Sequence, residues 1–95
     1  VNGRNQVSEE VSFTAYPNPF SNQVAIQFKA TKSGVASLNL YDLNGKLVKH
    51  LFTGNMQEGM MKQIMLPSNG LTAGTYICRL QIGEAVINRR LILIK

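Results

Sequence analysis

The residue types that perform acid–base and nucleophilic chemistry are scarce in this chain of 95 residues. It contains one cysteine, Cys78, one histidine, His50, and a lone aspartate, Asp42. A hydrolytic triad needs a nucleophile, a base and an orienting acid. His50 falls on a predicted strand beside Lys49, where a solvated side chain is the usual outcome. The inventory therefore predicts no catalytic residue, and a small hydrolase is the least supported function.

The cysteine follows an alternating apolar pattern. Cys78 shares a predicted face with Tyr76, Leu80 and Ile82. No predicted helix terminus rich in cations lies nearby to lower its pKa, so the pattern favours a buried structural thiol over a reactive one. A single cysteine forms no internal disulfide, so cysteine usage does not indicate whether the protein works in an oxidising or a reducing compartment.

No cofactor and no metal site is expected. Asp42-Leu43-Asn44-Gly45 is similar to the opening of a calcium-binding loop, but the twelfth position holds Thr53 where a bidentate Glu is required. A hairpin turn is the better interpretation of Asn44-Gly45. The glutamates fall in predicted linker, loop or turn, and no zinc spacing or phosphate-binding glycine loop occurs.

The formal net charge is +5 and the isoelectric point about 9.7, which raises the question of nucleic acid. Specific binding of single strands needs aromatic and basic residues interleaved on one face. The cations here are scattered, and only Arg89 and Arg90 are adjacent. We therefore expect no nucleic-acid partner, although the charge would favour anionic glycans or a lipopolysaccharide surface. No segment reaches the roughly 18 apolar residues of a membrane span.

Short segments with alternating apolar residues, separated by turn signals, run along the chain. Val24, Ile26 and Phe28 form the clearest example. Residues 53–59 read as a polar loop. No segment shows a helical period, so we predict an all-β fold, an immunoglobulin-like antiparallel β-sandwich of about seven strands. The predicted strands are residues 13–16, 24–29, 36–41, 47–52, 60–66, 76–82 and 85–94.

The beginning of the chain is polar and aperiodic. Residues 1–12 are therefore predicted to be a linker from an upstream domain, followed by a β-sandwich formed by residues 13–95. Because Val1 is not a start methionine, we expect the sequence to be a piece of a longer protein, and the lack of a signal peptide says nothing about localisation.

The final stretch is unusual because it offers apolar side chains to both faces of a strand. Two interpretations remain open: a central strand covered on both faces, or a strand that adds to a partner's sheet or is read by a receptor. An exposed apolar edge also predicts self-association through residues 91–94. The stretch consists of Arg89, Arg90, Leu91, Ile92, Leu93, Ile94 and Lys95.

Four segments follow one another along the chain: residues 16–20, residues 40–48, residues 71–76 and the basic, apolar last strand. Their motif and turn residues are Tyr16, Pro17, Asn18, Pro19 and Phe20; Tyr41, Asp42, Asn44, Gly45 and Lys46; and Gly74, Tyr76 and Gly83. In this order and spacing the segments resemble the type A carboxy-terminal sorting domain of the type IX (Por) secretion system of Bacteroidetes. The resemblance covers roughly residues 13–95.

Each motif also has a local physical interpretation. Pro17 and Pro19 stiffen the segment that precedes the first long strand. Asn44-Gly45 predicts a type I′ turn with two positive φ angles. Gly74 is expected to permit a close approach before Tyr76 enters the core.

The resemblance implies a folded secretion signal that is a substrate of the machinery and not an enzyme. Cargo would cross the inner membrane by a signal peptide, pass through the periplasm and leave by the outer-membrane translocon. A sortase would cleave in or near residues 1–13 and attach the cargo to the cell surface, unless the cargo is released. The last strand, through Lys95, would be read as part of the signal.

Two alternatives compete with this interpretation. The immunoglobulin-like domain of the flagellar hook-cap protein also opens with a Pro-Asn-Pro-Phe turn, but the Trp-Asp-Gly-like stretch expected near residues 66–70 is absent here. A passive adhesion or glycan-binding module would need exposed aromatic residues, for which Phe20, Phe52 and Tyr41 are the candidates.

Overall fold

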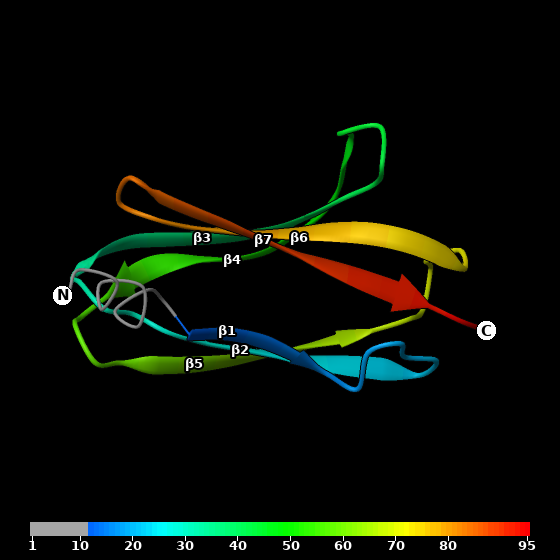
Figure 1. The fold of residues 1–95 in the computed structure, drawn as a ribbon, viewed down its shortest axis with the longest axis horizontal. Helices are drawn as coiled ribbons and strands as arrows, with labels where there is room; N and C mark the ends of the chain where they lie inside the picture. Colours follow the sequence, from blue (N-terminus) through cyan, green and yellow to red (C-terminus); the bar gives the residue numbers. More distant parts are fainter. Residues whose placement is uncertain (1–11) are drawn as a thin grey trace, which may run out of the picture.

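Two antiparallel sheets pack face to face in the computed structural model, which describes residues 12–95 (Figure 1). One sheet has the order β1-β2-β5 and the other β4-β3-β6-β7. This confirms the predicted all-β sandwich, and the arrangement is consistent with an immunoglobulin-like fold. The described part of the chain contains no helix that could cross a membrane. The strands are β1 (Ser12–Tyr16), β2 (Gln23–Lys29), β3 (Gly34–Tyr41), β4 (Leu47–Met56), β5 (Met61–Pro67), β6 (Gly74–Ile82) and β7 (Ala85–Leu93).

The core lies between the sheets and is built from alternate residues of each strand. Val24, Ile26 and Phe28 of β2 are fully buried, as their alternation predicted. Each such side chain contributes roughly 1.5–3 kcal/mol when it leaves water. Buried residues from β3 and β6 cover them from the opposite sheet: Ala36, Leu38, Leu40, Tyr76, Cys78, Leu80 and Ile82.

The prediction of a polar loop over residues 53–59 was wrong in its first half. Strand β4 continues to Met56, which is buried. The Phe52 ring lies over Gly54, so closely that a Cβ on Gly54 would come within 2.9 Å of it. The aromatic ring therefore covers the gap that a glycine leaves in a strand, and the small polar residues here stay in the sheet.

The turn between β3 and β4 is not the predicted type I′ turn. Among residues 12–95 positive φ angles occur only at glycines, so Gly45 has one (85°) and Asn44 does not. The Gly45 N–H donates to Asp42 O at 3.0 Å, and the Asp42 N–H donates to Lys46 O at 3.0 Å. This is a type I turn followed by a glycine bulge.

Two further glycines meet backbone requirements. Gly83 (φ 59°) occupies the first central position of the two-residue turn between Ile82 and Ala85, as in a type II′ turn. Gly74 has φ 151°, but a Cβ at this position would meet nothing within 4 Å. The expected close approach at Gly74 is therefore wrong, and the φ angle is what favours glycine there.

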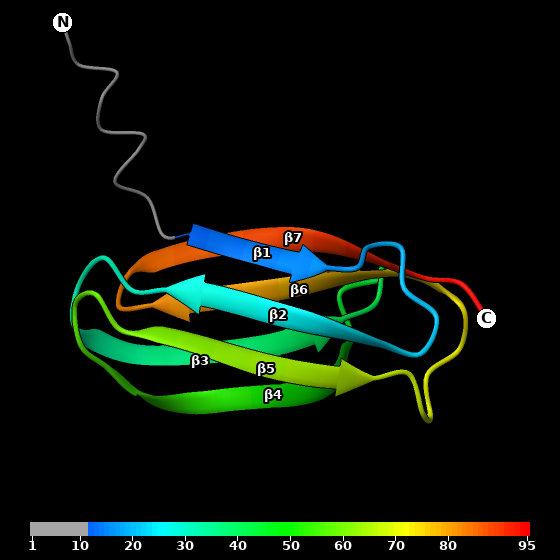
Figure 2. The ribbon, with the colours of Figure 1, turned by 90° about the horizontal axis from the view of Figure 1, so that it is seen from below.

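The last strand lies at a sheet edge, so the central-strand interpretation was wrong. Within the described residues β7 pairs with one strand only, β6. β1 runs beside β7 from the other sheet (Figure 2). The alternating pattern had indicated which faces are apolar, but it holds no information on how many neighbours a strand has.

The sandwich is elongated, with extents of 44 × 29 × 23 Å. Ser12, the first residue of β1, lies at one end, and Lys95 lies at the other (Figures 1 and 2). The predicted linker over residues 1–12 falls outside the described residues except for Ser12.

Candidate functional site

The outer edge of the last part of β7 is closed by the loop that follows β1. The Asn18 side chain donates from Nδ2 to Arg90 O at 2.8 Å and accepts the Ile92 N–H at 3.0 Å. Two residues on, the Phe20 N–H donates to Ile92 O at 2.9 Å, and Phe20 O accepts the Ile94 N–H at 2.8 Å. Over residues 90–94 the loop therefore satisfies main-chain groups that an edge strand normally leaves bare.

The same loop is anchored in the core by Phe20, whose side chain is only 1% exposed. Its main chain forms a parallel bridge with Leu93. The Tyr16-Pro17 and Asn18-Pro19 peptide bonds are both cis. The chain thus leaves the first sheet at Tyr16 and joins the edge of the second sheet at Phe20.

Strand alternation divides the seven residues of the last stretch into two groups. Leu91 and Leu93 are buried in the core. Arg90 and Ile92 point to the outer face of the sheet, and Ile94 beyond them is 54% exposed. The apolar residues of the stretch therefore fall on both sides of the strand: Leu91 and Leu93 fill the core, whereas Ile92 and Ile94 lie at the surface.

Arg89 belongs to the inward group, although its side chain is exposed. Its Nε donates to Phe13 O at 3.0 Å, and its guanidinium lies 5.5 Å from the centre of the Phe13 ring. Because Phe13 is on β1, this side chain joins the two sheets at their neighbouring edges. An inward charge on an edge strand also discourages pairing with another sheet.

The motif segments gather at one end of the sandwich (Figure 2). The 16–20 loop, the β3–β4 turn, residues 71–76 and the end of β7 all lie there. The Tyr76 hydroxyl donates to Thr72 O at 2.5 Å, which secures the third segment. Only the Gly83 turn lies at the other end, beside the start of β1.

The family model of the secretion system C-terminal sorting domain matches residues 14–95. The chain belongs to this family. No curated protein matches it. The sorting domain is thus a C-terminal signal of type IX secretion, which implies export through the envelope to the cell surface or the medium. A family of sorting signals is not a family of enzymes.

The titratable and nucleophilic side chains of the sorting domain do not form a cluster. Cys78 is fully buried, and this burial raises the pKa of its thiol from 9.0 to about 12. His50 is exposed, with Nδ1 2.7 Å from Asn39 Oδ1 and Nε2 2.9 Å from Thr53 Oγ1. Asp42 Oδ1 accepts the N–H groups of Asn44 and Lys46. Within residues 12–95 no three His, Cys, Asp or Glu side chains are placed to hold a metal ion.

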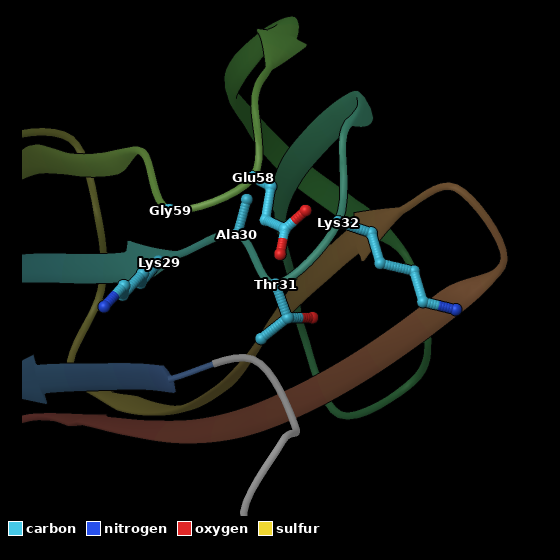
Figure 3. Close-up of a pocket in the computed structure, with 6 residues that line it drawn as sticks. All are labelled: Lys29, Ala30, Thr31, Lys32, Glu58 and Gly59. Carbon is cyan, nitrogen blue, oxygen red and sulfur yellow. The ribbon is translucent and has the colours of Figure 1, made fainter.

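An open cavity of about 410 Å³ lies at the β2–β3 and β4–β5 connections (Figure 3), which are at the end opposite the C-terminus (Figure 1). The Glu58 carboxylate points toward Thr31, whereas Lys29 and Lys32 extend away from it. The cavity offers one carboxylate beside one hydroxyl and is distant from the clustered motif segments.

The aromatic residues proposed for a glycan-binding module do not form a face. Phe20 is buried, and Phe52 packs against Phe28 with ring centres 6.1 Å apart. Tyr41 lies on the sheet surface under the Arg79 guanidinium, 4.9 Å from its ring centre. The most exposed aromatic residue described is Tyr16, at 78%, which the sequence had marked only as a motif residue. The sequence analysis also did not single out Leu43, Leu47 and Val48. Their segment has no alternating pattern that would indicate exposed apolar side chains.

Proposed function

We propose that the secretion machinery reads the sorting domain from the last stretch, Arg89 to Lys95, through two different roles. Arg90, Ile92, Ile94 and Lys95 present the recognised surface. Arg89, Leu91 and Leu93 hold that surface in place through the core and β1. The observation that supports this division is that Leu91 and Leu93 are buried while Arg90, Ile94 and Lys95 are exposed, on a part of the strand whose outer main-chain groups are already bonded.

Side-chain recognition fits this strand better than main-chain addition. The Arg90 carbonyl and both main-chain groups of Ile92 are bonded to Asn18 or Phe20. A partner strand would have to displace Phe20 from the core, which costs roughly 1.5–3 kcal/mol for a buried phenylalanine. The outward side chains, by contrast, need no rearrangement to be contacted.

Self-association through residues 91–94 requires the same opening. Leu91 and Leu93 are buried, so a second copy could pair with β7 only after Asn18 and Phe20 release it. We therefore expect light scattering to detect dimers mainly under conditions, or in variants, that loosen the 16–20 loop.

The wider pathway is part of the proposal. Residues 1–12 join an upstream cargo to the sorting domain, residues 13–95. Cargo passes through the periplasm, the translocon binds the signal, and a sortase cleaves in or near residues 1–13. The opposite placement of Ser12 and Lys95 supports this order, because a partner at the signal end leaves the cargo end accessible (Figure 1).

The test is a truncation that spares the core. Deletion of residues 92–95 also removes buried Leu93, so a loss of export would not separate signal from stability. Deletion of residues 94 and 95 alone should keep the fold, checked by urea unfolding, and prevent surface display of a periplasm-directed fluorescent cargo. Normal display of the shorter variant would overturn the proposal.

A further inference from the structure

The hairpin that joins β3 to β4 carries three exposed aliphatic residues within a short stretch of sequence. Leu43 is 67% exposed, Leu47 53% and Val48 38%. Figure 1 shows this turn bending away from the sandwich, above the outer face of the four-stranded sheet. Apolar side chains gathered on a projecting element, with polar neighbours, are typical of an interaction site.

The fold does not need these side chains to be apolar. None of the three belongs to the core or packs against it among the described residues. The turn is held instead by Asp42, whose Oδ1 accepts the N–H groups of Asn44 and Lys46, each at 2.9 Å. A partner would therefore meet a preformed apolar tip and lose little entropy in ordering it.

An open groove of about 300 Å³ lies beside the hairpin. Asp42 and Val48 line it on the hairpin side, and residues 70–76 line it from the β5–β6 connection and the start of β6. The Tyr76 hydroxyl bond to Thr72 O fixes the second wall. A groove next to a raised tip matches an irregular protein surface better than a flat lipid surface.

The charges around the hairpin indicate the chemistry of the partner. Lys46 and Lys49 are exposed and flank Leu47 and Val48 in the sequence, whereas the Asp42 carboxylate is engaged in the turn. The other carboxylates among residues 12–95, Glu58 and Glu84, lie in loops at the opposite end (Figure 2). The complementary surface is apolar at its centre and acidic at its rim.

We propose that the hairpin of residues 42–48 is a second docking surface, which binds a protein of the secretion machinery with an acidic rim around an apolar pocket. This inference rests on the proposed function of the last stretch, which lies at the same end of the sandwich. Binding at both places would fix the orientation of the domain on its partner as well as its affinity.

The test replaces exposed aliphatic residues in matched pairs. Leu43→Ser with Leu47→Ser alters the hairpin. Val35→Ser with Val86→Ser removes side chains of similar exposure, 56% and 50%, from the outer face of the same sheet. Each pair is introduced into the cargo fusion, and urea unfolding checks the fold.

We expect the hairpin pair to lower surface display about tenfold, which corresponds to the loss of two modest apolar contacts. The control pair should lower it less than about twofold. Unchanged display of the hairpin pair would overturn the inference, as would an equal loss in both pairs. If the hairpin pair behaves as the wild type while deletion of residues 94 and 95 prevents display, the inference fails and the proposed function stands. Normal display of the deletion variant contradicts the proposed function itself.

A lipid surface is the alternative occupant that a second measurement separates. Purified wild-type domain should not float with vesicles of phosphatidylcholine and phosphatidylglycerol. Flotation of the wild type that the hairpin pair abolishes would replace the protein partner by an anionic membrane surface and overturn the proposal.

Discussion

The side-chain amide of Asn18 takes the place of a neighbouring strand against Ile92. Its Oδ1 accepts the Ile92 N–H at 3.0 Å while its Nδ2 donates to the carbonyl of Arg90 at 2.8 Å. A carboxamide offers one acceptor and donors in the geometry of a peptide group. An edge strand near the end of the chain is thereby closed without a further strand.

Replacing Asn18 by alanine should therefore have two effects. The Asn18→Ala variant should lose about 1 kcal/mol in the free energy of unfolding, because the freed groups lie at the surface and water satisfies them in part. It should also self-associate more readily, as light scattering at high concentration would record. Asn22→Ala, an exposed change in the same connection, is the control. Equal behaviour of the two variants would argue against closure of the edge by Asn18.

Arg89 and Arg90 are adjacent in sequence but should differ in effect. Arg89→Ala removes a bond to Phe13 O and a cation–π contact, so urea unfolding should show a loss of about 1–2 kcal/mol. Arg90→Ala removes an outward side chain and should change stability by less than about 0.5 kcal/mol. Export of a fused cargo should fall with Arg90→Ala despite its intact fold. The reverse pattern would contradict the division of the strand into holding and presenting residues.

Two neighbouring alanine substitutions in the β3–β4 hairpin should differ in their effect on stability. Gly45→Ala places a Cβ on a residue with φ 85° and should cost about 1–2 kcal/mol. Asn44→Ala should cost less than about 0.5 kcal/mol, because Asn44 has an ordinary negative φ in this turn. Thermal unfolding of both variants distinguishes the observed bulged turn from a type I′ turn, in which both substitutions would be costly.

The burial of the Cys78 thiol should make the stability of the fold depend on pH. Burial raises the pKa of its thiol to about 12 in the folded chain, whereas in the unfolded chain the thiol titrates near 9.0. The folded state thus retains the proton that the unfolded state releases, so the contribution is complete below pH 9 and is lost as the pH rises toward 12. Urea unfolding across this range should fall more steeply for the wild type than for Cys78→Ala. Parallel curves would show that the thiol is not buried.

Local alternation was enough to predict most of the strands and the class of fold. Period-two patterns in residues 24–28, 36–40 and 76–82 place one face of each strand in the core, and burial there matches. The position of β7 at a sheet edge could not be predicted, since alternation reports which faces are apolar and not which edges are paired. The burial of Phe20 could not be predicted either, because a single aromatic residue between a proline turn and a polar loop has no period.

The turn type illustrates a different limit. Asn-Gly favours a type I′ turn by statistics, but the Asp42 carboxylate bonds two N–H groups and stabilises the bulged type I turn. The function, finally, came from resemblance. The four motif segments are ordinary turn chemistry, and only their order along the chain pointed to a sorting signal. Their convergence at one end of the sandwich, with the exposed hairpin among them, could be seen only in three dimensions.

Recognition of the outward side of the last strand is tested by surface fluorescence of a periplasm-directed cargo fused to this chain with Arg90→Ser and Ile94→Ser. The matched control, Lys29→Ser with Met65→Ser, removes an exposed cation and an exposed apolar side chain from the outer face of the other sheet. With both variants folded, we expect the first pair to leave the cargo in the periplasm while the control is displayed normally. Normal display of the first pair, or equal loss in both, would show that the machinery does not read this surface.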